Sequence, residues 1–342
     1  MTIKSMSSEY ILITGGAGYI GSHTAVELCN AGFKIIIIDN LSNSTVKVIN
    51  NIQKLSKSKI IFYNADVCNR IALEKIFSNH KINSVMHFAG FKSVSESSEY
   101  PLDYYLNNVG STLALLKTMD LFNVRKIVFS SSATVYGEPK VLPISENSAL
   151  QPSNTYGQTK LICEKILQDL KKSSDLWNFA ILRYFNPVGA HESGLIGDRP
   201  NGIPNNIMPY ITQVASGERA FLNIFGNDYQ TTDGTGVRDF IHVVDLAKGH
   251  LSALNYLMNT NSSVIVNLGR GEGISVLKLV ETFERVNNVK VPYFYTHRRT
   301  GDIAISYADT KYANQVLNWK ANLNIEGMCK DAWAWYLKSC KT

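Results

Sequence analysis

Two side chains suited to proton transfer stand four residues apart, at Tyr156 and Lys160. Residues with this spacing share one face of a helix, so the phenol oxygen and the ammonium group can converge. Ionising a free phenol at pH 7 costs roughly 4 kcal/mol. One cation ~6 Å away, at an effective dielectric constant of ~20, stabilises the ionised phenol by roughly 3 kcal/mol. This is less than the cost of ionisation, so the phenol needs a second cation to act as a base. Ser132 lies just after the end of a predicted strand and offers a hydroxyl to the reacting oxygen.

A glycine-rich segment at residues 14–21 lies between an apolar strand and a predicted helix. Its glycines Gly15, Gly18 and Gly21 let the backbone turn tightly, and amides at the helix start can hold a pyrophosphate. The next apolar run ends in Asp39, eighteen residues after Gly21. A carboxylate there accepts hydrogen bonds from ribose hydroxyls and repels a 2′-phosphate. The predicted cofactor is therefore NAD rather than NADP, and its oxidised nicotinamide is the second cation that the phenol needs.

The first half of the chain alternates apolar strands with helical stretches, which predicts a parallel sheet covered on both faces. The fold class is α/β, a Rossmann-type doubly wound parallel sheet with a smaller α/β C-terminal substrate lobe. We expect residues 1–186 to form the NAD-binding domain, residues 187–342 to form mainly the substrate lobe, and a strand near 263–268 to return to the first domain. The predicted strands are 10–13, 34–38, 59–63, 84–88, 126–130, 179–184 and 263–268, and the predicted helices include 69–78, 101–120 and 155–170.

Composition narrows the function classes. The chain of 342 residues carries a net charge of +6 from dispersed basic residues, which does not indicate nucleic-acid binding. Its five cysteines are scattered without a C-x-x-C pair, so neither a disulfide framework nor a metal site is expected, and a reducing cytoplasm fits. We expect no signal peptide and no membrane span, because no apolar run approaches ~20 residues.

The combination of a dinucleotide loop, a strand-end serine and Tyr-x-x-x-Lys resembles the extended short-chain dehydrogenase/reductase superfamily. From Ile11 to about Trp335 the chain more specifically resembles the UDP-glucose 4-epimerases. The motifs that carry this resemblance are TGGAGYIGSH at 14–23, DNLSNS at 39–44, HFAG at 87–90, SSSATVYG at 130–137, YGQTK at 156–160, RYFNPVGAH at 183–191, GIPNNIMPY at 202–210, IFGNDY at 224–229, DGTGVRDFIHVVDLA at 233–247 and RRTGD at 298–302.

The resemblance implies a redox isomerisation: hydride leaves carbon 4 of a UDP-hexose for tightly held NAD, the 4-keto sugar turns over, and the same hydride returns. It makes Tyr156 the base, Lys160 its cation and Ser132 the hydroxyl partner, all three also beside the cofactor. The other residues implied to line NAD are Gly15, Gly18, Tyr19, Ile20, Gly21, Asp39, Asn40, Leu41, Ser42, Asn43, Ser44, Asp66, Val67, Phe88, Ala89, Gly90, Phe91, Lys92, Asn107 and Phe185. Those implied to hold the UDP-sugar, besides Ser132 and Tyr156, are Asn186, Asn206, Asn223, Ile224, Phe225, Arg238, Arg299, Asp302 and Ser306. A homodimer is implied, with helices 101–120 and 155–170 pairing across it, although their apolar stripes could equally be internal core.

Several alternatives stay open at this stage. Arg238 could form a local ion pair with Asp239, Asp66 could merely end a strand, and Lys92 could only cover the surface. A 4,6-dehydratase needs an acid/base pair where this chain has Ser132-Ala133-Thr134. A uronate epimerase would need further positively charged groups to bind the carboxylate of its sugar. A scaffold that only senses NAD would not need Ser132, Tyr156 and Lys160.

Substrate breadth depends on Ser306. The resemblance implies that a small residue here leaves room for an acetamido group at carbon 2, so that UDP-N-acetylhexosamines also react. Alternatively, Tyr307 turns inward and closes the gap.

Overall fold

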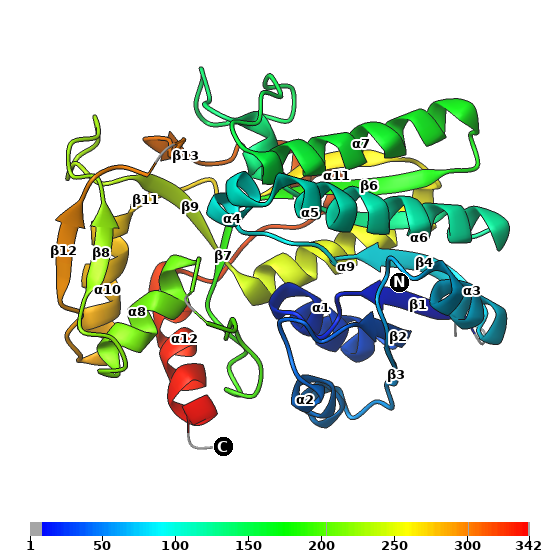
Figure 1. The fold of residues 1–342 in the computed structure, drawn as a ribbon, viewed down its shortest axis with the longest axis horizontal. Helices are drawn as coiled ribbons and strands as arrows, with labels where there is room; N and C mark the ends of the chain where they lie inside the picture. Colours follow the sequence, from blue (N-terminus) through cyan, green and yellow to red (C-terminus); the bar gives the residue numbers. More distant parts are fainter. Residues whose placement is uncertain (1–8, 203, 300, 341–342) are drawn as a thin grey trace.

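A computed structural model describes residues 9–202, 204–299 and 301–340 of the chain. Figure 1 shows a larger lobe built on a parallel sheet and a smaller lobe that holds the last helix. The described residues form a seven-stranded parallel sheet with the strand order β10-β6-β5-β4-β1-β2-β3. Its strands are β1 Tyr10–Thr14, β2 Lys34–Asp39, β3 Ile61–Asn64, β4 Ile82–His87, β5 Lys126–Ser132, β6 Asn178–Tyr184 and β10 Val264–Leu268. The α/β fold class and the seven predicted strands are confirmed, with boundaries shifted by up to two residues.

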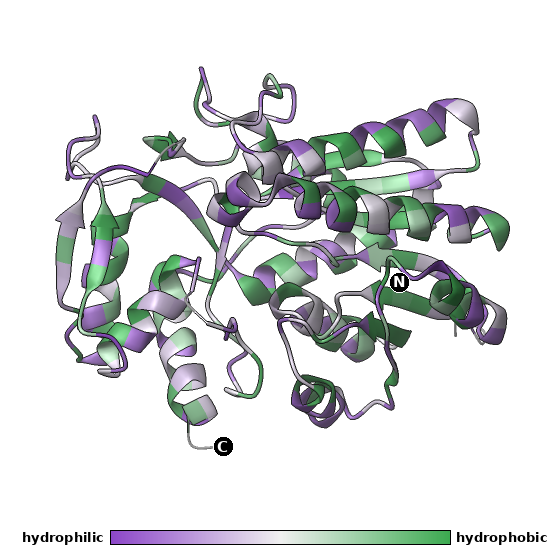
Figure 2. Ribbon diagram, in the orientation of Figure 1, coloured by the Kyte–Doolittle hydropathy of each residue, from purple (hydrophilic) through white to green (hydrophobic). Residues whose placement is uncertain are grey.

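Apolar residues alternate between the two faces of this sheet, as strand geometry requires. Ile11 and Ile13 of β1 face one core, whereas Leu12 faces the other. Helices α1 (Tyr19–Asn30), α2 (Val46–Ser56), α9 (Val243–Thr260) and α11 (Lys311–Leu317) cover the first face. Helices α3 (Arg70–Asn79), α6 (Gly110–Leu121) and α7 (Thr155–Ser173) cover the second. Figure 2 shows the resulting hydrophobic strands between helices whose outer faces are polar.

The helix predicted over 101–120 is interrupted. It divides into α5 (Pro101–Tyr104), a π-helical turn η1 (Tyr105–Val109) and α6, after the short helix α4 (Val94–Glu99). The wider turn carries Asn108, whose buried side chain bonds to backbone atoms of Phe91. Single π turns of this kind often occur at functional sites, and periodicity alone could not predict it.

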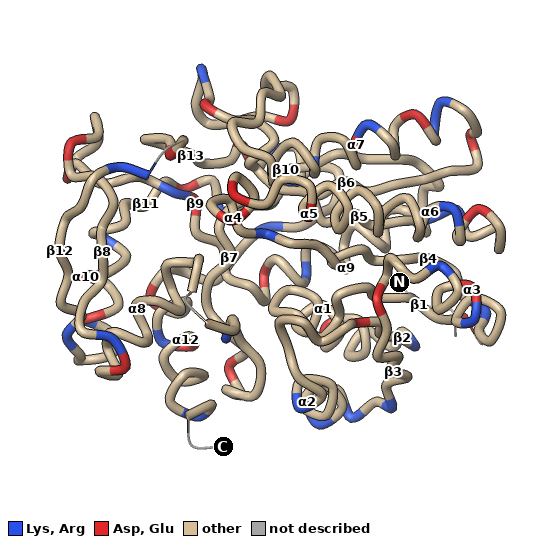
Figure 3. The backbone as a smooth tube through the Cα atoms, viewed as in Figure 1, with Lys and Arg blue, Asp and Glu red and all other residues tan. Residues whose placement is uncertain are grey.

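The smaller lobe has its own core of apolar side chains. Strands β7 (Asn186–Val188), β11 (Gly273–Ser275) and β13 (Ile305–Ser306) pair with β9 (Val237–His242), and β8 (Leu222–Phe225) pairs with β12 (Tyr293–Thr296). Helices α8 (Ile207–Ala215), α10 (Val276–Asn287) and α12 (Ile325–Cys340) pack against them. Lysines and arginines are scattered over both lobes (Figure 3). None of the helices in the described part of the chain is long and apolar enough to span a membrane.

Candidate active site

The glycine-rich loop joins β1 to α1 and forms a cradle that side chains would fill. Gly15 has a φ of +67°, and a Cβ there would lie 2.7 Å from the amide nitrogen of Ala89. A Cβ on Gly21 would lie 2.3 Å from the carbonyl oxygen of Gly15. Helix α1 begins after Gly18 without a side-chain cap, so the free amides of its first turn are available to an anion. This geometry fits the pyrophosphate of a dinucleotide.

Asp39 ends β2 next to this loop, as the sequence predicted. Its side chain accepts hydrogen bonds from the amides of Ala17 at 3.0 Å and Leu41 at 2.8 Å. Burial raises the pKa of Asp39, and these amides act in the opposite direction. Asp66 lies nearby, where it accepts from the side chain of Asn40 at 2.9 Å. The structure thus brings Asp39, Asn40 and Asp66 to one edge of the sheet.

The segment after β4 is held by a residue that the sequence analysis missed. Asn108 accepts from the Phe91 amide at 2.7 Å and donates to the Phe91 carbonyl at 3.0 Å. It also donates to Thr159 on α7 at 3.0 Å. Asn107, which was expected to line NAD, donates to Asn108 at 3.0 Å. Asn108 is one of several polar residues between 101 and 120, so no sequence signal singled it out.

Lys92 lies 3.8 Å from Asp198, measured from Nζ to the carboxylate, so it forms a weak ion pair between the two lobes. A surface cavity of about 710 Å³ opens beside this segment. Its lining includes Phe91 and Asn107 from the expected NAD site, together with Cys68. The cavity residues lie where contact with a cofactor is possible. Lys92 itself is paired with Asp198.

Tyr156, Lys160 and Ser132 meet at the carboxyl end of β5. Asn154 caps α7 by accepting from the Gly157 amide at 2.8 Å, which fixes where the helix begins. The Lys160 nitrogen lies 5.9 Å from the centre of the Tyr156 ring and donates to the Ser130 carbonyl at 2.8 Å. All three side chains are buried. The structure therefore brings together the Tyr156–Lys160 pair that spacing predicted and the strand-end hydroxyl of Ser132.

Burial sets the protonation of this triad. It raises the pKa of Tyr156 to about 12, against a lowering effect of the Ser132 hydroxyl. It lowers the pKa of Lys160 to about 8, against the raising effects of Cys163 and Glu164. Burial thus disfavours both charged forms, the phenolate of Tyr156 and the ammonium of Lys160. A further positive charge must approach the phenol before it can act as a base at neutral pH.

Charged side chains of the smaller lobe converge at the ends of β9 and β13. Arg238 forms an ion pair with Asp302, not with Asp239 as the alternative interpretation had it. Asp239 instead accepts from three backbone amides, those of Arg270, Gly271 and Ala308. Arg299 stacks on the Phe225 ring at 3.9 Å from its centre. Two arginines with a carboxylate suit a nucleoside diphosphate.

Ser306 pairs with Arg238 in the register of β13 and β9, so their side chains share one face. Tyr307 lies against Gly273 instead: a Cβ on that glycine would be 3.3 Å from its ring. The tyrosine is therefore engaged elsewhere. Ser306 itself is buried, 7% exposed.

The side chains of some expected binding residues are occupied by other contacts. The side chains of Ile224 and Val67 lie in apolar cores. Asn206 donates to Asp198 at 3.1 Å. For these residues the sequence motif indicated a segment near the expected site, but the side chain itself is not free to contact a ligand.

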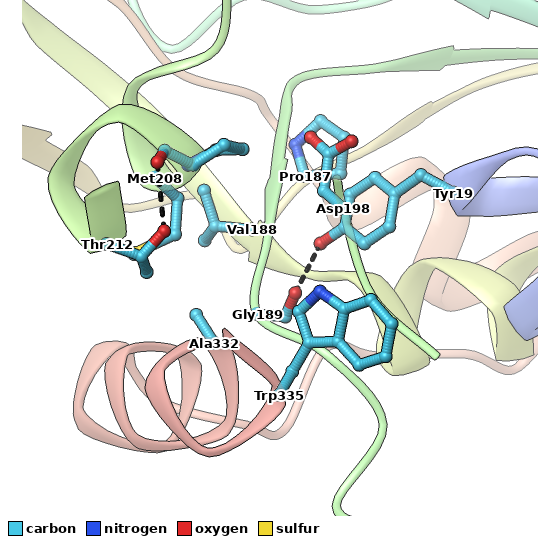
Figure 4. A pocket seen from close by; sticks show the side chains of 10 residues that line it. Tyr19, Pro187, Val188, Gly189, Asp198, Met208, Thr212, Ala332 and Trp335 are labelled. Carbon is cyan, nitrogen blue, oxygen red and sulfur yellow. Dashed lines mark hydrogen bonds between the residues drawn. The ribbon is translucent and has the colours of Figure 1, made fainter. Parts of the chain in front are cut away.

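Tyr19 joins the two lobes. Figure 4 shows its hydroxyl directed at the Gly189 carbonyl, with Asp198 and Trp335 nearby, around a small cavity. This hydrogen bond measures 2.7 Å. Burial, and then the charge of Asp198, raise the pKa of Tyr19 well above its ordinary value, so it stays a neutral donor. The Tyr19 hydroxyl is thus already engaged in a contact between the lobes.

Comparisons with known proteins show which family the chain belongs to. The family model described as GDP-mannose 4,6 dehydratase matches residues 12–332. A UDP-glucose 4-epimerase of Bacillus subtilis (strain 168) is 52% identical over 325 residues, 95% of this chain and 96% of the relative. One of Dictyostelium discoideum is 54% identical over 328 residues, 96% of this chain and 95% of the relative.

Solved structures extend the similarity to the fold. The UDP-glucose 4-epimerase of Bifidobacterium longum, in complex with NAD+ and UDP, has a TM-score of 0.94 and 45% identity, covering 97% of this chain and 99% of that one. A UDP-Glc/GlcNAc 4-epimerase of Campylobacter jejuni has a TM-score of 0.84 and 36% identity, covering 96% and 99% of the two chains.

Proposed function

Because the chain belongs to the family described as GDP-mannose 4,6 dehydratase, and within it to the UDP-glucose 4-epimerases, we propose that Tyr156, Lys160 and Ser132 perform its reaction. That reaction is NAD-dependent epimerisation at carbon 4 of a UDP-hexose, with UDP-galactose and UDP-glucose as the pair. The observation that carries the residue assignment is the buried Tyr156–Lys160 pair at the end of β5, in the same lobe as the glycine cradle.

Each side chain has one task. Tyr156 takes the proton from the 4-hydroxyl and returns it from the same oxygen after the sugar has turned over. Lys160 holds a positive charge near the phenol, which lowers the cost of its ionised form. Ser132 shares the hydrogen bond to the reacting oxygen and positions it. When bound, NAD supplies the hydride acceptor for carbon 4 and a second positive charge beside Tyr156.

The remaining predicted residues divide between the two ligands. We propose that Arg238 and Arg299 hold the diphosphate and that Asp302 accepts from the uridine ribose. The domain division is part of the same proposal: residues 1–186, joined by β10, bind NAD, and residues 187–342 mainly bind the UDP-sugar. The pairing of β10 with β6 supports it.

A 4,6-dehydratase is the alternative that the name of the family model suggests. That reaction needs an acid/base pair beside the strand-end hydroxyl. This chain has Ala133 and Thr134 after Ser132, and neither is an acid. The epimerase assignment is therefore favoured.

The substrate range extends, in our proposal, to UDP-N-acetylhexosamines. Ser306 is small and shares the face of Arg238, while Tyr307 lies over Gly273. The Campylobacter jejuni relative is described as acting on both the glucose and the N-acetylglucosamine forms. Ser306→Tyr should suppress turnover of the acetylated pair and spare the plain pair, because bulk is added where the acetamido group would extend.

Tyr307→Phe is the matched control, since it keeps the ring over Gly273 and should leave both pairs unaffected. Failure of the wild-type protein to turn over either acetylated sugar, under conditions where UDP-galactose reacts readily, would exclude this extension.

We also propose a homodimer in a cytoplasmic setting. Leu102, Leu106 and Leu113 on α5, η1 and α6 recur at spacings of four and seven residues, and they are 75%, 71% and 46% exposed. A stripe of this kind matches helix pairing with a second copy. The cysteines of the described chain are free thiols, which suits a reducing compartment.

The direct test of the residue assignment is Tyr156→Phe, assayed on UDP-galactose. Removing only the proton-transfer oxygen should lower kcat by at least about 100-fold while NAD remains bound. Tyr63→Phe is the matched control, because its hydroxyl bonds to His80 and has no part in the site. Near-wild-type turnover by folded, NAD-loaded Tyr156→Phe would refute the assignment.

A further inference from the structure

One fully buried ion pair lies directly behind the triad. Glu164 on α7 and Arg183 on β6 meet at 2.7 Å, with their side chains 0% and 3% exposed. Arg183 also donates from Nε to the Glu164 carboxylate at 3.0 Å. Buried pairs contribute little to stability over apolar packing, yet breaking one is costly. The pair is therefore more informative for the groups that it contacts than for its contribution to the stability of the protein.

The Glu164 carboxylate reaches the strand that holds the catalytic lysine. Ser131 donates to Glu164 at 2.5 Å. Its neighbours in β5 are Ser130, whose carbonyl accepts from Lys160, and Ser132. Glu164 therefore fixes Ser131, the middle of the three serines. Of its two neighbours, Ser132 belongs to the triad and Ser130 accepts the hydrogen bond from Lys160.

Arg183 carries the network on toward the sugar-binding lobe. It donates to the Tyr136 hydroxyl at 3.1 Å, and Tyr136 donates to Asn267 on β10 at 2.6 Å. Asn267 donates to the Ile144 carbonyl at 2.9 Å. The Ile144 amide in turn donates to the carbonyl of Tyr307, beside Ser306. Buried hydrogen bonds thus connect the catalytic helix to the strand at the sugar.

Glu164 also lies one helical turn beyond Lys160, close enough for its charge to act on the ammonium group. Burial lowers the pKa of Lys160, and the charges of Cys163 and then Glu164 raise it. The titratable groups facing Lys160 are Tyr156, Cys163 and Glu164 from α7 and His87 from β4. Burial lowers the pKa of His87 to about 3, so it is uncharged. Burial also raises the pKa of the Cys163 thiol and that of the Tyr156 phenol, so both are neutral at pH 7. Glu164 is then the carboxylate that opposes loss of the Lys160 proton.

We propose that Glu164 is a positioning residue for the epimerase reaction: it fixes β5 through Ser131 and keeps Lys160 protonated. The proposal rests on the function assigned above to Lys160. Removing the carboxylate charge must destabilise the ammonium form, so the pKa of Lys160 falls.

The test is the pH profile of kcat for Glu164→Gln with UDP-galactose. We expect its basic limb to move down by on the order of one pH unit. If the limb moves from about pH 8 to about pH 7, the rate at pH 8 falls about fivefold while the rate at pH 6 changes little. A basic limb that stays at the wild-type pH would overturn the proposal.

Two further variants keep the outcome decisive. Leu167→Ala removes buried apolar volume from the same helix, so it should lower Tm without moving the basic limb; an equal shift would count against the proposal. If Glu164→Gln does not fold, Glu164→Gln combined with Arg183→Gln removes both charges, which a buried site tolerates better. The basic limb should still move down, but by less than in the single variant, because the positive charge of Arg183 is lost with the carboxylate; an unmoved limb would overturn the proposal.

Lys160→Ala separates this inference from the function on which it rests. A wild-type rate in Lys160→Ala would refute the role of Lys160 itself. An impaired Lys160→Ala beside an unshifted Glu164→Gln would refute only the role of Glu164.

Discussion

Replacing Lys160 by methionine removes the fixed charge beside the phenol and keeps much of the side-chain volume. The nitrogen lies 5.9 Å from the Tyr156 ring centre. At an effective dielectric constant of ~20, the lost attraction is about 3 kcal/mol, equivalent to about 100-fold in rate. We therefore expect kcat for UDP-galactose at pH 7 to fall by about two orders of magnitude.

The pH dependence identifies the cause. Loss of the cation raises the pKa of Tyr156, so the variant has less phenolate at any pH below that pKa. Its rate should rise about tenfold per pH unit as the phenol ionises unaided, and the deficit should narrow above pH 8. The assay follows UDP-glucose by chromatography, and kcat is expressed per bound NAD because Lys160 also lies near the expected cofactor site. A deficit below threefold, or one that does not narrow at high pH, would refute this reasoning.

Two other predictions concern the cofactor and the assembly. Protein stripped of NAD should regain activity with NAD and little with NADP, because the buried Asp39 carboxylate meets the position of a 2′-phosphate; equal recovery with both would exclude this role for Asp39. Leu106→Glu should convert the dimer to a monomer in light scattering, whereas Leu337→Glu, which changes an exposed leucine on α12, should not; a wild-type mass for Leu106→Glu would place the interface elsewhere.

Local patterns predicted the parts of the site that depend on local geometry. The β1–α1 glycine loop and Tyr156 with Lys160 each lie on one continuous segment, so spacing and periodicity were sufficient. The strand order could not be derived from such patterns, but alternation of strands and helices restricts it to a few topologies.

Contacts between residues far apart in the sequence could not be predicted from local patterns. Asn108 acts through Phe91, seventeen residues away, and Glu164 meets Arg183 across nineteen residues. Arg238 has an acidic neighbour in sequence, yet it pairs with Asp302. In each case the partner depends on how distant segments pack in the fold, which local sequence patterns do not reveal.

The most direct test of the central claim uses UDP-galactose labelled with deuterium at carbon 4. The purified protein, without added NAD, should convert it to UDP-glucose that retains the deuterium at carbon 4, because the hydride that leaves is the one that returns. Mass spectrometry and NMR of the product measure this retention. Loss of the label to solvent, or a strict requirement for added NAD in protein that already contains one NAD per chain, would contradict the account.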